Sequence, residues 1–151
     1  QEIVGEIQTR PDWARVDATK KTLKPTSITT LPHPGFPTDL QAPIMALLTT
    51  IEGISLVQDT VYDDRFTHIA ELERLGAKIK LKGNTAQIYG GSPLSSAPIM
   101  ASDLRAGAAL VLAALVAEGE TSLSRIYHID RGYEDFETKF RSLGVDIKRV
   151  S

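Results

Sequence analysis

The chain has 151 residues, of which 42% are hydrophobic, 24% are charged and none is cysteine. This length can enclose one hydrophobic core, and the absence of cysteine excludes disulfides, thiolate metal sites and a cysteine nucleophile from these residues. The formal net charge of −2 argues against a general attraction to nucleic acid or to acidic membranes, and the first residues lack the features of a signal peptide. We therefore expect a cytoplasmic protein that contacts no membrane.

Strand-like alternation and helical spacing of hydrophobic residues divide the chain into elements separated by Gly and Pro. In the first half we expect strands at 3–7, 14–18 and 27–30, a proline-rich loop at 31–37, a helix at 40–52, a strand at 54–61, a helix at 67–75 and a hairpin of 77–81 with 85–89. The order then recurs as a strand at 97–100, a helix at 102–119, a strand at 121–127, a helix at 133–143 and a strand at 145–150.

The recurrence is an internal repeat of a β-α-β-α-β-β unit. Asp39-Leu40-Gln41-Ala42 aligns with Asp103-Leu104-Arg105-Ala106, and Asp64-Arg65 aligns with Asp130-Arg131. A nearly constant offset with small length changes is typical of repeats joined by surface loops. We expect residues 1–30 to be the tail of a preceding unit, residues 31–92 to form a complete unit, and residues 93–151 to form a second unit without its last strand.

Within the helix expected at 102–119, the stretch from residue 104 to residue 117 is hydrophobic on almost every side. A helix without a polar face is normally buried all round. In a chain of this size we therefore expect this helix to be enclosed by strands and other helices.

Two aspartates occupy equivalent helix starts, Asp39 and Asp103. Position alone favours helix capping for both, because a carboxylate there accepts unpaired backbone N–H groups and complements the helix dipole. Asp39 is the better candidate for chemistry, because a rigid proline loop precedes it and Thr38 can supply the capping hydroxyl. A carboxylate that caps no helix can act as a general base towards a hydroxyl.

Arg65 and Arg131 are also equivalent, each lying between a strand and a helix. Each can pair with a neighbouring acid (Asp63, Asp64 or Asp130) or recognise a phosphate or carboxylate through its planar guanidinium. The three histidines share no metal-ligand spacing, and no glycine-rich phosphate loop is present. We expect no metal and no cofactor.

Four motifs in order make the sequence specific: Pro37-Thr38-Asp39-Leu40-Gln41-Ala42, Asp64-Arg65-Phe66, Ser102-Asp103-Leu104-Arg105-Ala106, and Arg125-Ile126-Tyr127-His128-Ile129-Asp130-Arg131-Gly132-Tyr133-Glu134. Together they resemble the UDP-N-acetylglucosamine enolpyruvyl transferase family, from residue 31 onward. The resemblance implies an α/β fold of repeated βαβαββ units with buried helices, an inside-out α/β barrel, of which this chain holds about two of the three units of the carboxy-terminal domain.

The resemblance also implies an activity. The family transfers the carboxyvinyl group of phosphoenolpyruvate to the 3′-hydroxyl of UDP-N-acetylglucosamine and releases phosphate, through a tetrahedral addition intermediate. This is the first committed step of peptidoglycan synthesis, on which cell-wall biogenesis, cell shape and cell division depend. On the sugar side, the resemblance makes Asp39 the general base, places Thr38 beside the sugar, and makes Val61 and Tyr62 border it. Tyr62 departs from the more usual phenylalanine.

On the anionic side, the resemblance assigns Arg131 to phosphoenolpyruvate and makes Arg65 and Arg105 further arginines of the cleft. Asp103 matches a second acid placed for proton transfer at the vinyl carbon. A multiply anionic substrate needs such a cationic clamp, and the attacking hydroxyl needs a base.

The family's lysine–asparagine pair and mobile lid loop have no counterpart in these residues, so we expect the chain alone to fold at least partly without turning over substrate. Two rival functions stay open at this point. An enolpyruvylshikimate-phosphate synthase shares the repeat and the reaction type. A non-catalytic βαβαββ module could bind RNA, but the acidic balance and the 6% aromatic content argue against nucleic acid as a partner.

Overall fold

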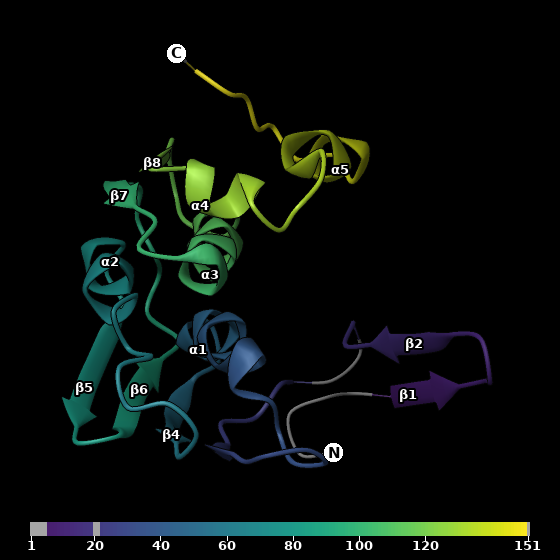
Figure 1. Cartoon of the computed structure of the whole chain (residues 1–151), viewed down its shortest axis with the longest axis vertical. Helices are drawn as coiled ribbons and strands as arrows, with labels where there is room; N and C mark the ends of the chain where they lie inside the picture. Colours follow the sequence, from purple (N-terminus) through teal and green to yellow (C-terminus); the bar gives the residue numbers. More distant parts are fainter. Residues whose placement is uncertain (1–5, 20–21, 151) are drawn as a thin grey trace.

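A mixed four-stranded sheet carries the first copy of the repeat (Figure 1). The computed structural model describes residues 6–19 and 22–150. The strands in spatial order are β3 (Ser27–Thr30), β4 (Gly53–Asp59), β6 (Thr85–Gly90) and β5 (Lys78–Lys82). Strand β3 runs parallel to β4, and β6 lies between β4 and β5, antiparallel to both. The hairpin expected around Gly83-Asn84 is confirmed as β5 and β6.

Two helices complete this copy and form the core with the sheet. A 3-10 turn, η1 (Thr38–Leu40), leads into α1 (Gln41–Thr49), and α2 (Ile69–Arg74) follows β4. The buried side chains come from one face of each helix and from the inner face of the sheet, which is the pattern expected of amphipathic elements around one core. They include Met45, Leu48, Val57, Leu72, Ala86 and Ile88.

The second copy repeats the first parallel strand pair around a helix. Strand β7 (Pro98–Met100) runs parallel to β8 (Ser122–Ser124), and α3 (Leu104–Ala114) connects them. Two shorter helices follow, α4 (Tyr127–Asp130) and α5 (Phe136–Ser142). The equivalent helices α1 and α3 lie side by side in the middle of the molecule (Figure 1).

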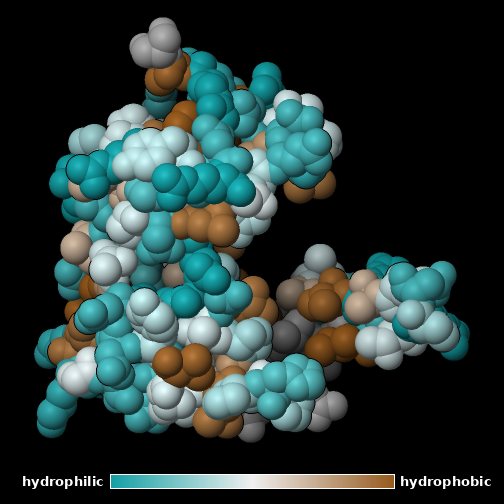
Figure 2. Space-filling view, in the orientation of Figure 1, coloured by the Kyte–Doolittle hydropathy of each residue, from teal (hydrophilic) through white to brown (hydrophobic). Residues whose placement is uncertain are grey.

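An antiparallel hairpin of β1 (Glu6–Thr9) and β2 (Ala14–Asp17) projects from the rest of the chain (Figure 1). Its surface includes the exposed hydrophobic residues Ile7, Trp13 and Val16, among hydrophilic neighbours (Figure 2). The strands expected at 14–18 and 27–30 are thus confirmed, whereas most of the strand expected at 3–7 lies outside the described residues.

Three expectations about the strands need correction. Residues 27–30 were expected in the tail of a preceding unit, but β3 is hydrogen-bonded to β4 and belongs to the sheet of the following copy. The strand expected at 121–127 ends at Ser124, because Arg125 adopts a positive φ of 56° and turns the chain into α4. The strand expected at 145–150 is wrong, since a strand needs a hydrogen-bonded partner and residues 145–150 pair with none of the described strands.

The prediction of a helix buried on every side is confirmed for most of α3 and fails at its end. Residues 106–111 are all buried, and six consecutive helical residues point in every direction round the axis. Leu112 is exposed, and Val116, which follows the helix, is 56% exposed. The hydrophobic stretch is therefore enclosed along its first turns and exposed at its C-terminal end. No helix within the described ranges has the length and apolar character needed to cross a membrane.

Gly90 allows the close approach of β6 to the end of α1. A Cβ atom at this position would overlap the backbone carbonyl oxygens of Leu48 and Ile51, which cannot move without disturbing the helix. We therefore expect Gly90→Ala to lower the free energy of unfolding by about 3 kcal/mol, the upper end of the usual cost of overpacking. Urea denaturation measures this change.

Gly83→Ala is the matched control. Gly83 has a positive φ of 59°, but a Cβ atom added to it would project into open space, with no heavy atom of the described residues beyond its chain neighbours within 4 Å. The variant should lose only about 1 kcal/mol, the cost of a left-handed alanine. Equal losses in the two variants would contradict the role assigned to Gly90.

Candidate functional site

Asp39 lies in η1, at the end of the proline-rich loop. The loop folds back on itself, with the Leu31 N–H donating to the Phe36 carbonyl and the Leu40 N–H donating to the Pro37 carbonyl, each at 3.0 Å. Neither η1 nor α1 has a side-chain N-cap hydrogen bond. Asp39 therefore caps no helix, and its side chain is 60% exposed.

Two arginines from different copies of the repeat bind the same oxygen of Asp39. Arg105 Nε donates to Asp39 Oδ1 at 2.5 Å, and Arg65 Nη1 donates to it at 3.1 Å. Arg105 comes from the first turn of α3, whereas Arg65 comes from the segment between β4 and α2. The hydrogen bond from Arg105, assisted by Arg65, lowers the pKa of Asp39, so the carboxylate is ionised over the neutral range.

Asp103 caps a helix, as its position in the sequence predicts. It is the N-cap of α3, and its Oδ1 accepts the backbone N–H groups of Arg105 at 2.8 Å and Ala106 at 3.0 Å. The capping prediction is therefore confirmed for Asp103 and not for Asp39. Asp103 Oδ2 accepts a longer hydrogen bond from Ser102 Oγ at 3.3 Å.

Thr38 does not supply a capping hydroxyl, contrary to expectation. Its Oγ1 donates to Asp59 Oδ2 at 2.6 Å, a charge-assisted hydrogen bond that directs the hydroxyl towards the carboxylate at the end of β4. Val61 and Tyr62 follow in the next loop and are exposed. The Arg65 guanidinium lies 4.9 Å from the centre of the Tyr62 ring. This cation–π contact joins the loop to the ion pairs that Asp39 forms with Arg65 and Arg105.

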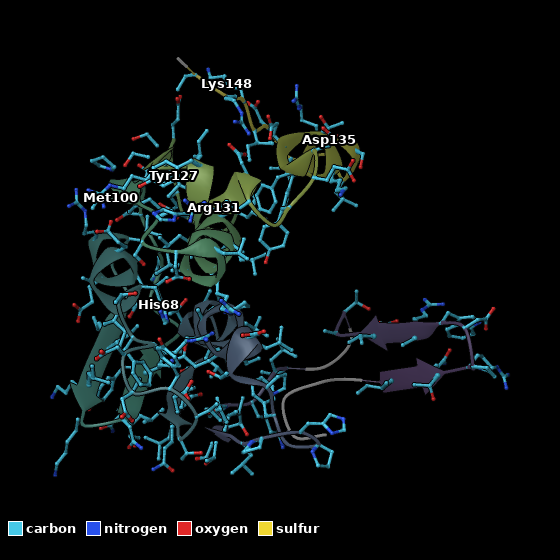
Figure 3. The ribbon with its side chains drawn as sticks, in the orientation of Figure 1. His68, Met100, Tyr127, Arg131, Asp135 and Lys148 are labelled. Atoms are coloured by element: carbon cyan, nitrogen blue, oxygen red, sulfur yellow. The ribbon has the colours of Figure 1, made fainter. Side chains whose placement is uncertain are left out.

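Arg65 and Arg131 do not pair with the acids next to them in sequence. Arg65 pairs with Asp39, while Asp130 is bound by both Nη atoms of Arg149 at 2.8 and 3.0 Å. Arg131 lies at the end of α4, with its guanidinium 5.9 Å from the centre of the Tyr127 ring (Figure 3). Among residues 6–19 and 22–150, no hydrogen bond or ion pair links Arg131 to Asp39.

His68 is a buried residue of this region that the sequence reasoning missed (Figure 3). It is 1% exposed, hydrogen-bonds to the backbone of Arg65 and lies within electrostatic range of Asp103. Burial lowers its pKa to about 4, despite the raising effect of Asp103, so the imidazole is neutral at physiological pH. The sequence signal was a histidine followed by the hydrophobic Ile69 and Ala70 at the start of a helix, which by itself predicts burial rather than a site.

The arrangement suits the recognition of an anion beside a base. Two guanidinium groups and one ionised carboxylate lie on an open surface, while a cavity of ≈ 450 Å³ lies elsewhere, between α3, α5 and residues 145–150. In the part of the chain that the structure describes, no group of three His, Cys, Asp or Glu side chains could hold a metal ion. The chemistry available to this surface is proton transfer and anion binding.

Comparison with known proteins assigns the chain to a family. Residues 1–140 match the family of EPSP synthase (3-phosphoshikimate 1-carboxyvinyltransferase). The chain belongs to the EPSP synthase family. Within this family it is 57% identical over 136 residues to a UDP-N-acetylglucosamine 1-carboxyvinyltransferase of Magnetococcus marinus, with 90% of this chain aligned to 32% of that protein. It is 52% identical over 151 residues to the protein of the same name from Acinetobacter guillouiae, with 100% of this chain aligned to 36% of the relative.

Solved structures of the EPSP synthase family agree with the expected fold. The enolpyruvyl transferase NikO from Streptomyces tendae matches with a TM-score of 0.88 at 30% identity, over 97% of this chain and 34% of that chain. An EPSP synthase from Acinetobacter baumannii matches with a TM-score of 0.66 at 18% identity, over 96% and 34% of the two chains, and shows the likeness of fold alone. The enolpyruvyl transferase fold is thus confirmed, and the chain spans about a third of the length of the relatives it matches.

The buried neutral imidazole of His68 predicts a pH-dependent stability. The pKa of His68 is about 4 in the folded protein, against 6.5 for an ordinary histidine, so between these values the unfolded state binds a proton that the native state does not. Stability from this group is therefore complete above about pH 6.5 and is lost as the pH falls towards 4. From about pH 7 to about pH 5, the loss attributable to His68 is about 2 kcal/mol.

Urea denaturation of the wild type and of His68→Gln at both pH values measures this contribution. The glutamine side chain can still donate a hydrogen bond to the Arg65 backbone. The free energy of unfolding of His68→Gln should fall on acidification by about 2 kcal/mol less than that of the wild type. His33→Gln, which changes an exposed histidine of the proline loop, should behave like the wild type. A parallel pH dependence in all three proteins would show that His68 is not buried in the neutral form.

Proposed function

We propose that this chain is part of a transferase that moves the carboxyvinyl group of phosphoenolpyruvate to the 3′-hydroxyl of UDP-N-acetylglucosamine and releases phosphate. The observation that carries the proposal is the convergence of Arg65 and Arg105 on the uncapped carboxylate of Asp39. It occurs in a chain 57% identical to a protein named for this reaction. We expect the activity in the cytoplasm, in support of peptidoglycan synthesis and hence of cell shape and division.

In the proposed mechanism, Asp39 accepts the proton of the sugar hydroxyl while that oxygen bonds to the central carbon of phosphoenolpyruvate. The vinyl carbon gains a proton, and a tetrahedral adduct forms. Loss of a proton from the resulting methyl group and cleavage of the carbon–phosphate oxygen bond then release phosphate and restore the double bond. Asp103 is our candidate for the proton exchange at the vinyl carbon, because its Oδ2 is not engaged in capping.

The arginines link substrate binding to the basicity of Asp39. In the unliganded chain Arg65 and Arg105 stabilise the ionised carboxylate and lower its pKa, which makes Asp39 a weak base. A phosphate or carboxylate group of a substrate that binds these guanidinium groups withdraws them from Asp39. The proton affinity of Asp39 then rises when the hydroxyl is in place, as a general base requires.

The remaining candidate residues would bind the two substrates. We propose that Thr38, Val61 and Tyr62 contact the sugar nucleotide, and that Arg131 binds phosphoenolpyruvate. The Arg131 guanidinium lies over Tyr127, and no carboxylate of residues 6–19 and 22–150 forms an ion pair with it, so it is available to an anion. We further propose that the two copies are units of the carboxy-terminal domain, with the first unit starting at β3 rather than at residue 31.

One alternative has a specific observation in its favour. The description of the matching family names a different acceptor of the carboxyvinyl group, 3-phosphoshikimate. Against it, the EPSP synthase from Acinetobacter baumannii is only 18% identical, whereas the relatives named for UDP-N-acetylglucosamine are above 50%. The relatives and structures named above give no support to an RNA-binding role.

Ligand stabilisation of the full-length protein distinguishes the two acceptors. UDP-N-acetylglucosamine at about 100 times its Kd should stabilise the protein by about 2.7 kcal/mol, seen as a rise in Tm, while 3-phosphoshikimate should give no rise. The 151-residue chain alone, incubated with the sugar nucleotide and phosphoenolpyruvate, is expected to release no phosphate above background. Stabilisation by 3-phosphoshikimate alone would refute the proposed acceptor.

Removing the base provides the direct test of Asp39. In the full-length protein, Asp39→Asn should lower kcat by about 10²- to 10⁴-fold, the usual contribution of a general base. The Tm should change little, because exposed ion pairs contribute about 1 kcal/mol or less. Phosphate release measures the rate, and Asp12→Asn, which changes an exposed carboxylate of the β1–β2 turn, is the control. A kcat within twofold of the wild type would exclude Asp39 as the base.

A further inference from the structure

Asp59, the last residue of β4, is a buried carboxylate without a basic partner. It is 0% exposed, and within the described ranges no Lys, Arg or His forms an ion pair with it. A buried charge is costly unless hydrogen bonds replace its water. Here four donors do so, two hydroxyls and two backbone N–H groups.

The four hydrogen bonds are divided between the two oxygens. Asp59 Oδ1 accepts from Thr30 Oγ1 at 2.8 Å and from the backbone N–H groups of Val61 and Tyr62, each at 2.9 Å. Asp59 Oδ2 accepts from Thr38 Oγ1 at 2.6 Å. One carboxylate thus joins the end of β3, the turn that carries Asp39 and the loop after β4.

The hydrogen bonds also keep this group charged. Burial acts to raise the pKa of Asp59, but the bonds from Thr38, Tyr62, Thr30 and Val61 together hold it below its ordinary value. Hydrogen bonds to an ionised acceptor are shorter and stronger than neutral ones. The connection between the Thr38 turn and the Val61–Tyr62 loop is therefore a stiff one, although the two segments are separated in sequence.

We propose that Asp59 is a positioning residue, which fixes the carboxylate of Asp39 relative to the Val61–Tyr62 loop. This inference rests on the proposed function, in which Asp39 takes a proton from a sugar hydroxyl and the loop borders the same sugar nucleotide. Thr38 is the residue before Asp39, so the Oδ2 bond sets where the base lies. The Oδ1 bonds fix the Val61–Tyr62 loop, which borders the sugar. The Asp59 carboxylate thereby fixes the distance between the Asp39 base and the sugar hydroxyl.

Asp59→Asn in the full-length protein separates the two halves of this arrangement. The amide oxygen can still accept the three Oδ1 donors, while the amide nitrogen replaces the acceptor that faces Thr38. We expect kcat to fall about 10-fold or more, because a small misplacement of a catalytic group costs that much, and KM for UDP-N-acetylglucosamine to stay within about threefold. Rates are measured at a temperature where every variant is folded.

Thr60→Val is the matched control. Thr60 Oγ1 donates to the Thr30 carbonyl at 2.5 Å in the same corner, but makes no hydrogen bond to Asp59. The variant should lower Tm about as much as Asp59→Asn while kcat stays within about twofold. A merely structural role for Asp59 predicts instead that the two variants lose Tm alike and keep the same kcat, and that result overturns the inference.

If Asp59→Asn does not fold, Thr38→Val decides the question, since it removes the Oδ2 donor at a partly exposed position. A kcat lowered about fivefold or more with KM for UDP-N-acetylglucosamine unchanged supports the inference. An unchanged kcat overturns it, and so does a loss accompanied by a raised KM, which reports a lost contact with the sugar nucleotide instead. Failure of the proposed function is recognised separately, because the wild-type protein would then neither be stabilised by UDP-N-acetylglucosamine nor release phosphate.

Discussion

The packing of α1 against α3 is the constraint on which the candidate site depends. Both helices belong to equivalent positions of the repeat, and their starts lie close enough for Asp39 and Arg105 to form an ion pair. Small buried residues of α3, such as Ala109 and Ala113, belong to the same core cluster as Met45 and Leu48 of α1 and allow the two backbones to approach. Neither copy alone contains the carboxylate together with both arginines, so the site exists only because the copies pack in this way.

The ion pairs at Asp39 are well suited to being broken. Arg65 and Arg105 bind one oxygen of a carboxylate that is 60% exposed, so water screens the attraction and the pairs add little to stability. Their effect on protonation is larger than their effect on folding, because both cations favour the ionised form. An anionic substrate can therefore displace the carboxylate at low cost, and the same event changes the basicity of Asp39.

Local signals explain what the sequence predicted correctly. Gly83-Asn84 between alternating hydrophobic residues specifies the β5–β6 hairpin, and the capping position of Asp103 follows from its helix start. The misses concern interactions between distant segments. Nothing near Thr38 indicates that its hydroxyl meets Asp59, and nothing near residues 145–150 reports whether a partner strand lies beside them. His68 was missed for the same reason, since its partners are defined by the fold.

The two copies of the repeat have diverged in the property that matters most for the site. Asp39 and Asp103 are equivalent in sequence, yet only Asp103 caps its helix, because the first copy enters α1 through the η1 turn and Asp39 lies inside that turn. The next difference is at Gln41 and Arg105, which are also equivalent, the first fully buried and the second directed at Asp39. One copy thus supplies the free carboxylate and the other supplies the guanidinium. A duplication with identical copies would have placed two capped aspartates beside each other, with no group left to act as a base.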